Sequence, residues 1–157
     1  MSKRISIALG LFLTLTVAYT ANSWDDKAEK GPNLKGVTCP ISGKPVVADG
    51  TAKHNGGTVY FCCTKCPDAF GKNTAKYAAK ANHQLARTGQ AKQVKCGLKG
   101  KPVNKKLSLE IAGVKVGFCC GGCKGAAGRA EGDAQIELIF NDKTFNKGYE
   151  VGKKKDA

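Results

Sequence analysis

Two short stretches with apolar residues at alternate positions predict a pair of matching β-strands. Val59 and Phe61 are the apolar residues of one stretch, and Val116 and Phe118 are those of the other. Because alternate residues of a strand point to the same side, each stretch predicts a strand with one buried face. A glycine-containing turn signal precedes each, so each is the predicted return strand of a β-hairpin. The turn signals are Asn55-Gly56-Gly57 and Ala112-Gly113.

Helical periodicity follows the strands. A helix is predicted to begin within each C-C-x-x-C sequence, and a second one over Thr74 to Ala86, with Gly89 as its stop. The apolar face of this second helix consists of Tyr77, Ala78, Ala81 and Leu85. The stretch from Gln135 to Asn141 fits both periods, because its apolar residues either alternate or recur at helical spacing.

The chain repeats itself with a period of 57 residues, without a gap. Gly43-Lys44-Pro45-Val46 recurs as Gly100-Lys101-Pro102-Val103, and the four cysteines of the first copy recur in the second. Such self-similarity predicts two homologous modules, and it favours a helix over 135–141. The eight cysteines are Cys39, Cys62, Cys63, Cys66, Cys96, Cys119, Cys120 and Cys123.

The first residues have the pattern of a secretory signal. Lys3 and Arg4 precede an apolar stretch from Ile5 to Val17, and Ala21 and Ser23 fit the −3 and −1 positions of a cleavage site. The apolar stretch is shorter than the ~20 residues of a membrane-spanning helix, so we expect no transmembrane span after signal removal. The predicted organisation is a signal peptide (1–23), an N-terminal segment (24–36), module 1 (37–88), a linker within 86–93, module 2 (94–150) and a basic tail (151–157).

The charge is strongly basic, with 26 Lys and Arg against 12 Asp and Glu among 157 residues, a formal net charge of +14. This composition is unlike that of a collagen-like chain or an acidic disordered tail, and the chain is short for a large single-core enzyme. From Gly50 to Leu109 there are 12 basic residues and one acid. In an exported protein, such a segment suits an anionic envelope polymer or an acidic protein better than nucleic acid. A merely solvated surface is the alternative.

The cysteine spacing within each module, C-x22-C-C-x2-C, is typical of a metal site. Cys62 and Cys66 are four residues apart, so a helix that begins between them brings both sulfurs to one point, and Cys39 approaches from a glycine turn. Three or four converging thiolates suit Zn²⁺ or Cu⁺. The fourth ligand stays open between the adjacent cysteine (Cys63 or Cys120), water, histidine and an external group.

The pattern resembles the TRASH/YHS family of treble-clef metal-binding modules over roughly 37–86 and 94–141. The run from Val59 to Cys66 carries the resemblance, followed by Phe70 and Tyr77. The resemblance implies a metal site in each module, with Cys39, Cys62 and Cys66 as ligands in the first and Cys96, Cys119 and Cys123 in the second. It also implies an α+β fold of two tandem treble-clef-like units, each a β-hairpin plus helix.

The sequence departs from this family at four positions. Ser42 and Lys99 stand where many members have a further cysteine, which leaves three firm ligands in each module. Ala127 and Ala134 replace the helix aromatics in module 2, so either its helix packs differently or its metal role is reduced.

Two other uses of the cysteines stay open. Eight cysteines in an exported chain also fit four disulfides in a structural or interaction module, and Cys63 to Cys66 and Cys120 to Cys123 look like redox C-x-x-C motifs. His54 is expected in a surface turn and His83 on a solvated helix face. We identify no catalytic or cofactor-binding set.

The sequence therefore predicts a secreted or periplasmic protein without catalytic activity. We expect each module to bind one Zn²⁺ or Cu⁺ ion, for metal trafficking, buffering or resistance.

Overall fold

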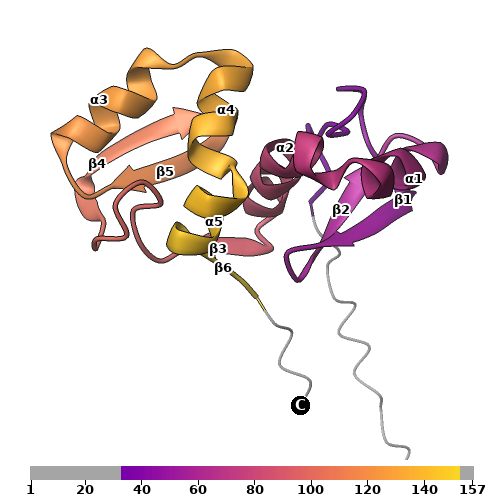
Figure 1. Ribbon diagram of the computed structural model, residues 1–157, viewed down its shortest axis with the longest axis horizontal. Coiled ribbons are helices and arrows are strands. Elements are labelled where there is room, and N and C mark those ends of the chain that lie inside the picture. The colour runs from indigo at the N-terminus through magenta and orange to yellow at the C-terminus, as the bar shows by residue number, and fades with distance from the viewer. Residues whose placement is uncertain (1–32, 153–157) are drawn as a thin grey trace, which may run out of the picture.

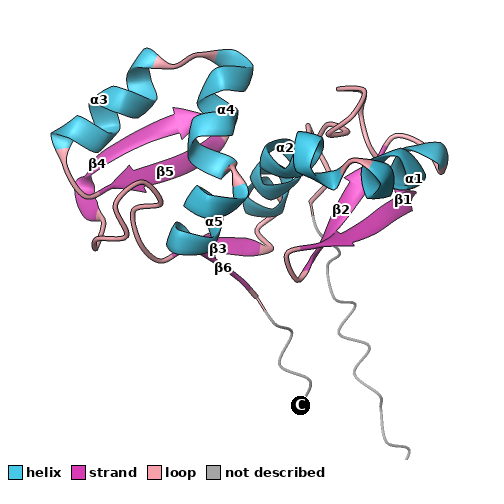
Figure 2. Cartoon of the chain, in the orientation of Figure 1, coloured by secondary structure: helices cyan, strands magenta, loops and turns pink. Residues whose placement is uncertain are grey.

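The computed structural model describes residues 33–152 and shows a mixed α/β protein (Figures 1 and 2). This confirms the predicted mixture of helices and small antiparallel sheets. The predicted signal peptide (1–23), most of the segment 24–36 and the tail residues 153–157 lie outside the described residues.

The first half of the structure is a β-hairpin followed by two helices. Asn55 and Gly56 form its tight turn, with φ angles of 46° and 83°, which is why the turn contains glycine. Gly57 follows the turn and begins the alternation that also buries Val59 and Phe61. The elements are β1 (Val47–His54), β2 (Gly57–Phe61), α1 (Lys65–Lys72) and α2 (Thr74–Arg87).

The second half has the same order of elements, and both its strands are displaced by 57 residues from those of the first. The predicted helix over 135–141 is confirmed, but it ends at Phe140. Asn141 adopts an extended backbone (ψ 156°) and its side chain accepts a hydrogen bond from the Thr144 N–H, so it begins a further helix. The elements are β4 (Asn104–Ile111), β5 (Val114–Phe118), α3 (Gly121–Arg129), α4 (Gly132–Phe140) and α5 (Asp142–Gly148).

The stretch expected as a linker is ordered secondary structure. α2 extends to Arg87, and residues Ala91–Gln93 form β3, which pairs antiparallel with β6 (Tyr149–Val151). Each half therefore ends in a three-residue strand, and these two strands join the halves to one another (Figure 1).

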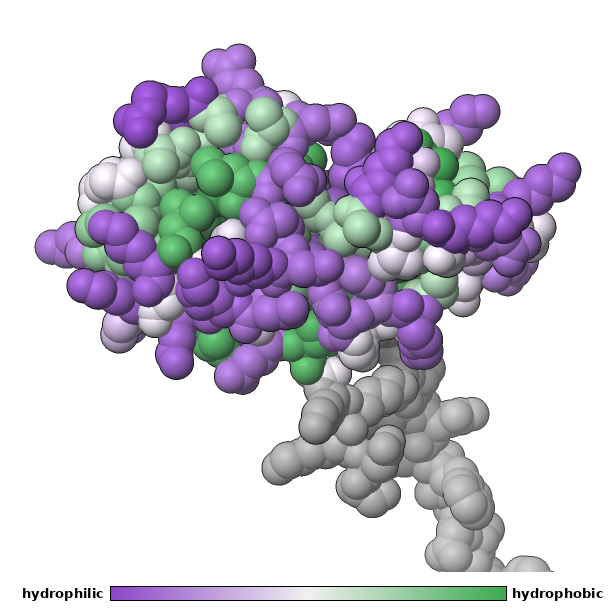
Figure 3. All heavy atoms as spheres, in the orientation of Figure 1, coloured by the Kyte–Doolittle hydropathy of each residue, from purple (hydrophilic) through white to green (hydrophobic). Residues whose placement is uncertain are grey.

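A continuous apolar core runs through both halves. Three of the four residues of the predicted α2 face are buried, with Ala81 and Leu85 fully inaccessible, while Tyr77 is partly buried. The helix also buries Ala79 and Asn82, because it lies between its own hairpin and α4 (Figure 1). Hydrophilic side chains cover most of the face seen in Figure 3, while apolar side chains gather on the second half.

Candidate metal centres

The first sulfur of each triad is held by a tight turn. The Cys39 N–H donates to the Lys44 carbonyl (2.8 Å), and the Gly43 N–H donates back to the Cys39 carbonyl (2.9 Å). Gly43 has a φ of 71°, which a residue without Cβ adopts at little cost. The same two bonds recur between Cys96 and Lys101 (2.9 Å) and between Gly100 and Cys96 (2.6 Å). The recurring sequence G-K-P-V is therefore the turn that places a buried cysteine.

The other two sulfurs come from the end of the return strand and the first turn of the helix. Cys62 follows β2 and Cys66 lies in α1, and their Sγ atoms are 3.7 Å apart. Cys119 and Cys123 have the equivalent places, with Sγ atoms 3.8 Å apart. With Cys39 and Cys96 they form two triads, and the sulfurs of each triad lie within 4.8 Å of one another.

These separations match a tetrahedral thiolate site. Four sulfurs at about 2.3 Å from one ion stand about 3.8 Å apart along each edge of the tetrahedron. The sulfur pairs on β2 and α1, and on β5 and α3, are already at that separation. Three thiolates of this kind suit a thiophilic ion and leave one tetrahedral position open.

Cys63 and Cys120 lie outside the two triads. The exposed Cys63 Sγ lies 3.4 Å from Cys66 Sγ, at the rim of the first triad. Cys120 is half-buried and stands at the N-cap of α3, while the N-cap of α1 is Thr64. The second helix thus begins one residue earlier relative to the repeat, so the two adjacent cysteines have different surroundings.

Within the triads, the cysteine of the turn and the cysteine of the helix differ in the pKa of their thiols. Burial opposes ionisation of Cys39, but hydrogen bonds from the Ser42 backbone and hydroxyl outweigh it and lower the pKa of Cys39 to about 7. Burial, together with the hydrogen bonds with Cys120 and Cys119, raises the pKa of Cys123 to about 12. The pKa of Cys96 is likewise lowered and that of Cys66 is raised, so the turn cysteine of each triad loses its proton more readily than the helix cysteine, whose proton a binding ion would have to displace.

Ser42 belongs to the first site, and sequence reasoning noted it only as a missing cysteine. Its Oγ lies 3.1 Å from Cys62 Sγ, within hydrogen-bonding distance. Lys99 stands at the equivalent position of the second half, where its charge helps to lower the pKa of Cys120, after the hydrogen bonds from Cys123. The same position of the repeat thus holds a polar neighbour at one site and a cation at the other.

The expectation for the two histidines was wrong. His54 has a relative exposure of only 9% and packs edge-on against Phe70, with ring centroids 5.4 Å apart. His83 packs against Phe140 at 5.0 Å and its Nε2 lies 3.2 Å from the Ala112 carbonyl. His54 is buried and His83 is partly buried, and neither belongs to a triad.

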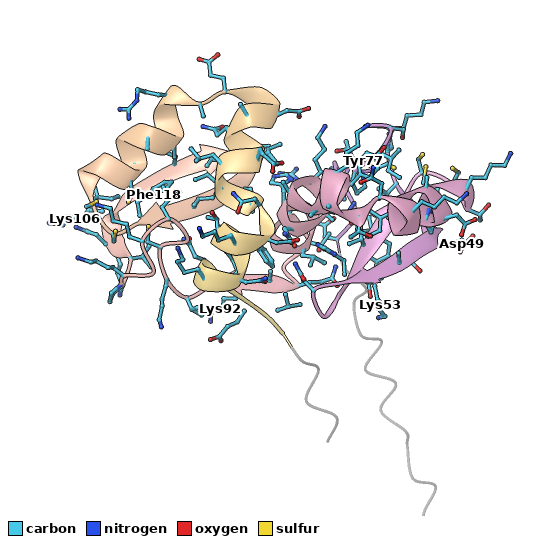
Figure 4. All side chains as sticks on the ribbon, viewed as in Figure 1. Asp49, Lys53, Tyr77, Lys92, Lys106 and Phe118 are labelled. Carbon is cyan, nitrogen blue, oxygen red and sulfur yellow. The ribbon has the colours of Figure 1, made fainter. Side chains whose placement is uncertain are left out.

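The two triads lie at opposite ends of the molecule (Figure 4). No helix among residues 33–152 is long and apolar enough to cross a membrane. In comparisons with known protein families, curated proteins and solved structures, nothing matches this chain. Fold and site together define a cysteine-rich mixed α/β protein with two cysteine triads at metal-binding distance.

Proposed function

We propose that the chain is an exported metal-binding protein of two tandem TRASH/YHS-like treble-clef modules. Each triad binds one Zn²⁺ or Cu⁺ ion, and the protein serves metal trafficking, buffering or resistance outside the cytoplasm, without catalysis. The sulfur separations of 3.7 Å and 3.8 Å carry the proposal, since they correspond to the edge of a thiolate tetrahedron.

The construction of the two halves supports this role. Each half is a small hairpin-and-helix unit, and units of this size usually depend on a metal or on disulfides for stability. All eight cysteines are unbonded in the structure, and six of them converge in threes. A metal ion at each triad would link three parts of that half: the turn that places Cys39 or Cys96, the return strand of the hairpin, and the helix that follows it.

The test is metal analysis combined with free-thiol titration on the mature protein, purified from an exported compartment. Two ions per chain are expected. Cys66→Ser and Cys123→Ser should each lose one ion, whereas Ser108→Ala, which leaves every cysteine in place, should retain both. Four disulfides and no bound metal would contradict the proposal and favour the disulfide-stapled alternative.

A second candidate, thiol–disulfide exchange, is favoured by one observation. Cys63 Sγ is exposed and lies 3.4 Å from Cys66 Sγ in a C-x-x-C sequence, so a small movement would allow a disulfide. Reductase activity that disappears in Cys63→Ser, in a protein that binds no metal, would favour this candidate.

A further inference from the structure

The two cysteine triads sit in very different electrostatic surroundings. In the first half, segments 37–49 and 62–72 carry three basic and two acidic residues. The equivalent segments 94–106 and 119–129 carry seven basic residues and no acid. The net charge of these segments is therefore +1 in the first half and +7 in the second, although the two sets of segments are equivalent in the repeat.

Most of this charge lies on the elements that hold the second triad. Lys99 and Lys101 belong to the turn that places Cys96, and the Lys101 carbonyl accepts the Cys96 N–H. Lys105 and Lys106 lie in a bulge of β4, between the residues that pair with Phe118 and Gly117, the two residues that precede Cys119. Lys147 of α5 reaches the same turn, with its Nζ 3.5 Å from the Leu98 carbonyl.

We call these five residues the lysine collar, namely Lys99, Lys101, Lys105, Lys106 and Lys147. All five are exposed, and within residues 33–152 none of them forms an ion pair with an acid. The collar's charge is therefore available to a ligand from solution.

The first triad lacks such a collar. The position equivalent to Lys99 is Ser42, which is engaged with Cys62, and the position equivalent to Lys106 is Asp49. In Figure 4, Asp49 lies at the end of the molecule with the sulfur atoms of the first half, and Lys106 at the opposite end with those of the second. Where the second half has the cation Lys106, the first half has the anion Asp49 at the equivalent position.

Resting on the proposed function, we propose that the metal in the second triad takes its fourth ligand from solution, and that this ligand is a small thiol carrying additional negative charge. Three thiolates and a divalent ion have a net charge of −1 and leave one tetrahedral position open. The ligand's S–H proton passes to the solvent, its sulfur forms the bond to the metal, and a bound water leaves. The collar attracts the anionic ligand and offsets the negative charge that accumulates.

The experiment uses the full-length mature chain loaded with two Co²⁺ ions under anaerobic conditions. Mercaptoacetate, a thiol with a carboxylate, is titrated against the neutral mercaptoethanol, and binding is monitored by the sulfur-to-cobalt and d–d absorption bands. One of the two ions should respond preferentially to mercaptoacetate, and added salt should weaken this response.

Exchanging residues between the halves provides matched variants. Lys99→Ser with Lys106→Asp gives the second site the residues of the first, removing three units of charge, and should weaken mercaptoacetate binding roughly tenfold. Ser42→Lys with Asp49→Lys should strengthen binding at the first site. All four positions are exposed, and each variant is first checked for two bound Co²⁺ ions.

The outcomes separate the two proposals. Failure of the wild-type chain to bind Co²⁺ through its cysteines overturns both. Two bound ions that respond equally to the two thiols, or an unchanged response after the exchange, overturn only the inference about the fourth ligand. A lack of any response also overturns it, because Cys120 or another protein group then fills the position.

Discussion

The side chain of Asn82 joins the two halves at the centre of the molecule. It is completely buried, accepts a hydrogen bond from the Asn55 Nδ2 (2.8 Å), and donates to the Phe140 carbonyl (2.9 Å) and to Asp142 (2.7 Å). These partners belong to the first hairpin turn, to the end of α4 and to the start of α5. A buried polar network of this kind fixes one relative position, because any other leaves its members unsatisfied.

Replacing Asn82 by leucine should destabilise the protein by about 2–3 kcal/mol, since the Phe140 carbonyl would lose this partner and the Asn55 and Asp142 side chains would each lose a hydrogen bond. The measurement is urea unfolding. Lys76→Ala, on an exposed position of the same helix, serves as the control and should change the free energy of unfolding by less than about 0.5 kcal/mol. Equal effects of the two substitutions would contradict the role given to Asn82.

His54 and His83 should make the free energy of unfolding depend on pH. Burial lowers the pKa of both below the ordinary 6.5, although Asp142 opposes this at His54. As the pH falls through about 6.5, the unfolded chain takes up protons before the folded chain does, so stability decreases. The decrease is complete once the pH lies below the pKa values of the folded state.

Urea titrations between pH 7.5 and 5 measure this dependence. The double variant His54→Gln, His83→Gln, compared with the wild type in the same metal-loading state, should show a smaller loss of stability over the range. A loss of the same size in both proteins would assign the pH dependence to other groups.

At the scale of the elements, glutamine side chains take the place of a third strand beside the two-stranded hairpins. The Gln84 amide bonds to both the N–H (2.6 Å) and the carbonyl (2.9 Å) of Tyr60 in β2. The Gln93 amide bonds in the same way to Gly117 of β5, at 2.7 Å and 2.8 Å. Tyr60 and Gly117 are 57 residues apart and therefore occupy equivalent positions in the two hairpins. The backbone groups at this strand edge bond to a glutamine of α2 in the first half and to a glutamine of β3 in the second.

Gln84→Met keeps the length of the side chain but removes the two hydrogen bonds to Tyr60 and a third to the Thr38 carbonyl, and should cost about 2 kcal/mol. The amide of Tyr60 should exchange its hydrogen faster, while that of Gly117 should be less affected. Gln93→Met should give the reverse pattern. Hydrogen exchange at these two amides checks the assignment, and indistinguishable exchange patterns for the two variants would overturn it.

The elements that could be predicted from sequence are those with strong local signals. The hairpin turn at Asn55-Gly56 and the face of α2 with Ala81 and Leu85 depend on short-range patterns. The pairing of β3 with β6 could not be predicted, because three residues show no alternation and the partner lies about sixty positions away. The boundary between α4 and α5 at Asn141 could not be predicted either, because it depends on a side-chain cap that follows an apolar stretch.

At the scale of the whole molecule, the triads were predictable and their surroundings were not. The spacing of Cys62 and Cys66 on the two sides of a helix start determines their proximity. His54 packs against Phe70 of α1 and lies 3.7 Å from Asp142 of α5, 88 residues later, so its burial could not be read from its own hairpin. The collar likewise includes Lys147, far from the turn of Cys96 in sequence.

Metal loading should stabilise the molecule as a whole. At a free ion concentration 1,000 times the dissociation constant, each occupied triad adds about 4 kcal/mol to the free energy of unfolding. Calorimetry should show a higher Tm with Zn²⁺ than with a chelator, and Cys66→Ser should lose about half of the increase. A Tm unaffected by metal would contradict coordination by the folded triads.

The pairing of β3 with β6 has a consequence for the order of synthesis. Ala91 emerges from the ribosome long before its partner Val151, so the first half can form its hairpin and helices while β3 is still single. The register between the halves is set only when the strand from Tyr149 to Val151 has been made. A chain stopped before residue 149 would therefore present β3 as an unpaired edge, open to the corresponding strand of another chain.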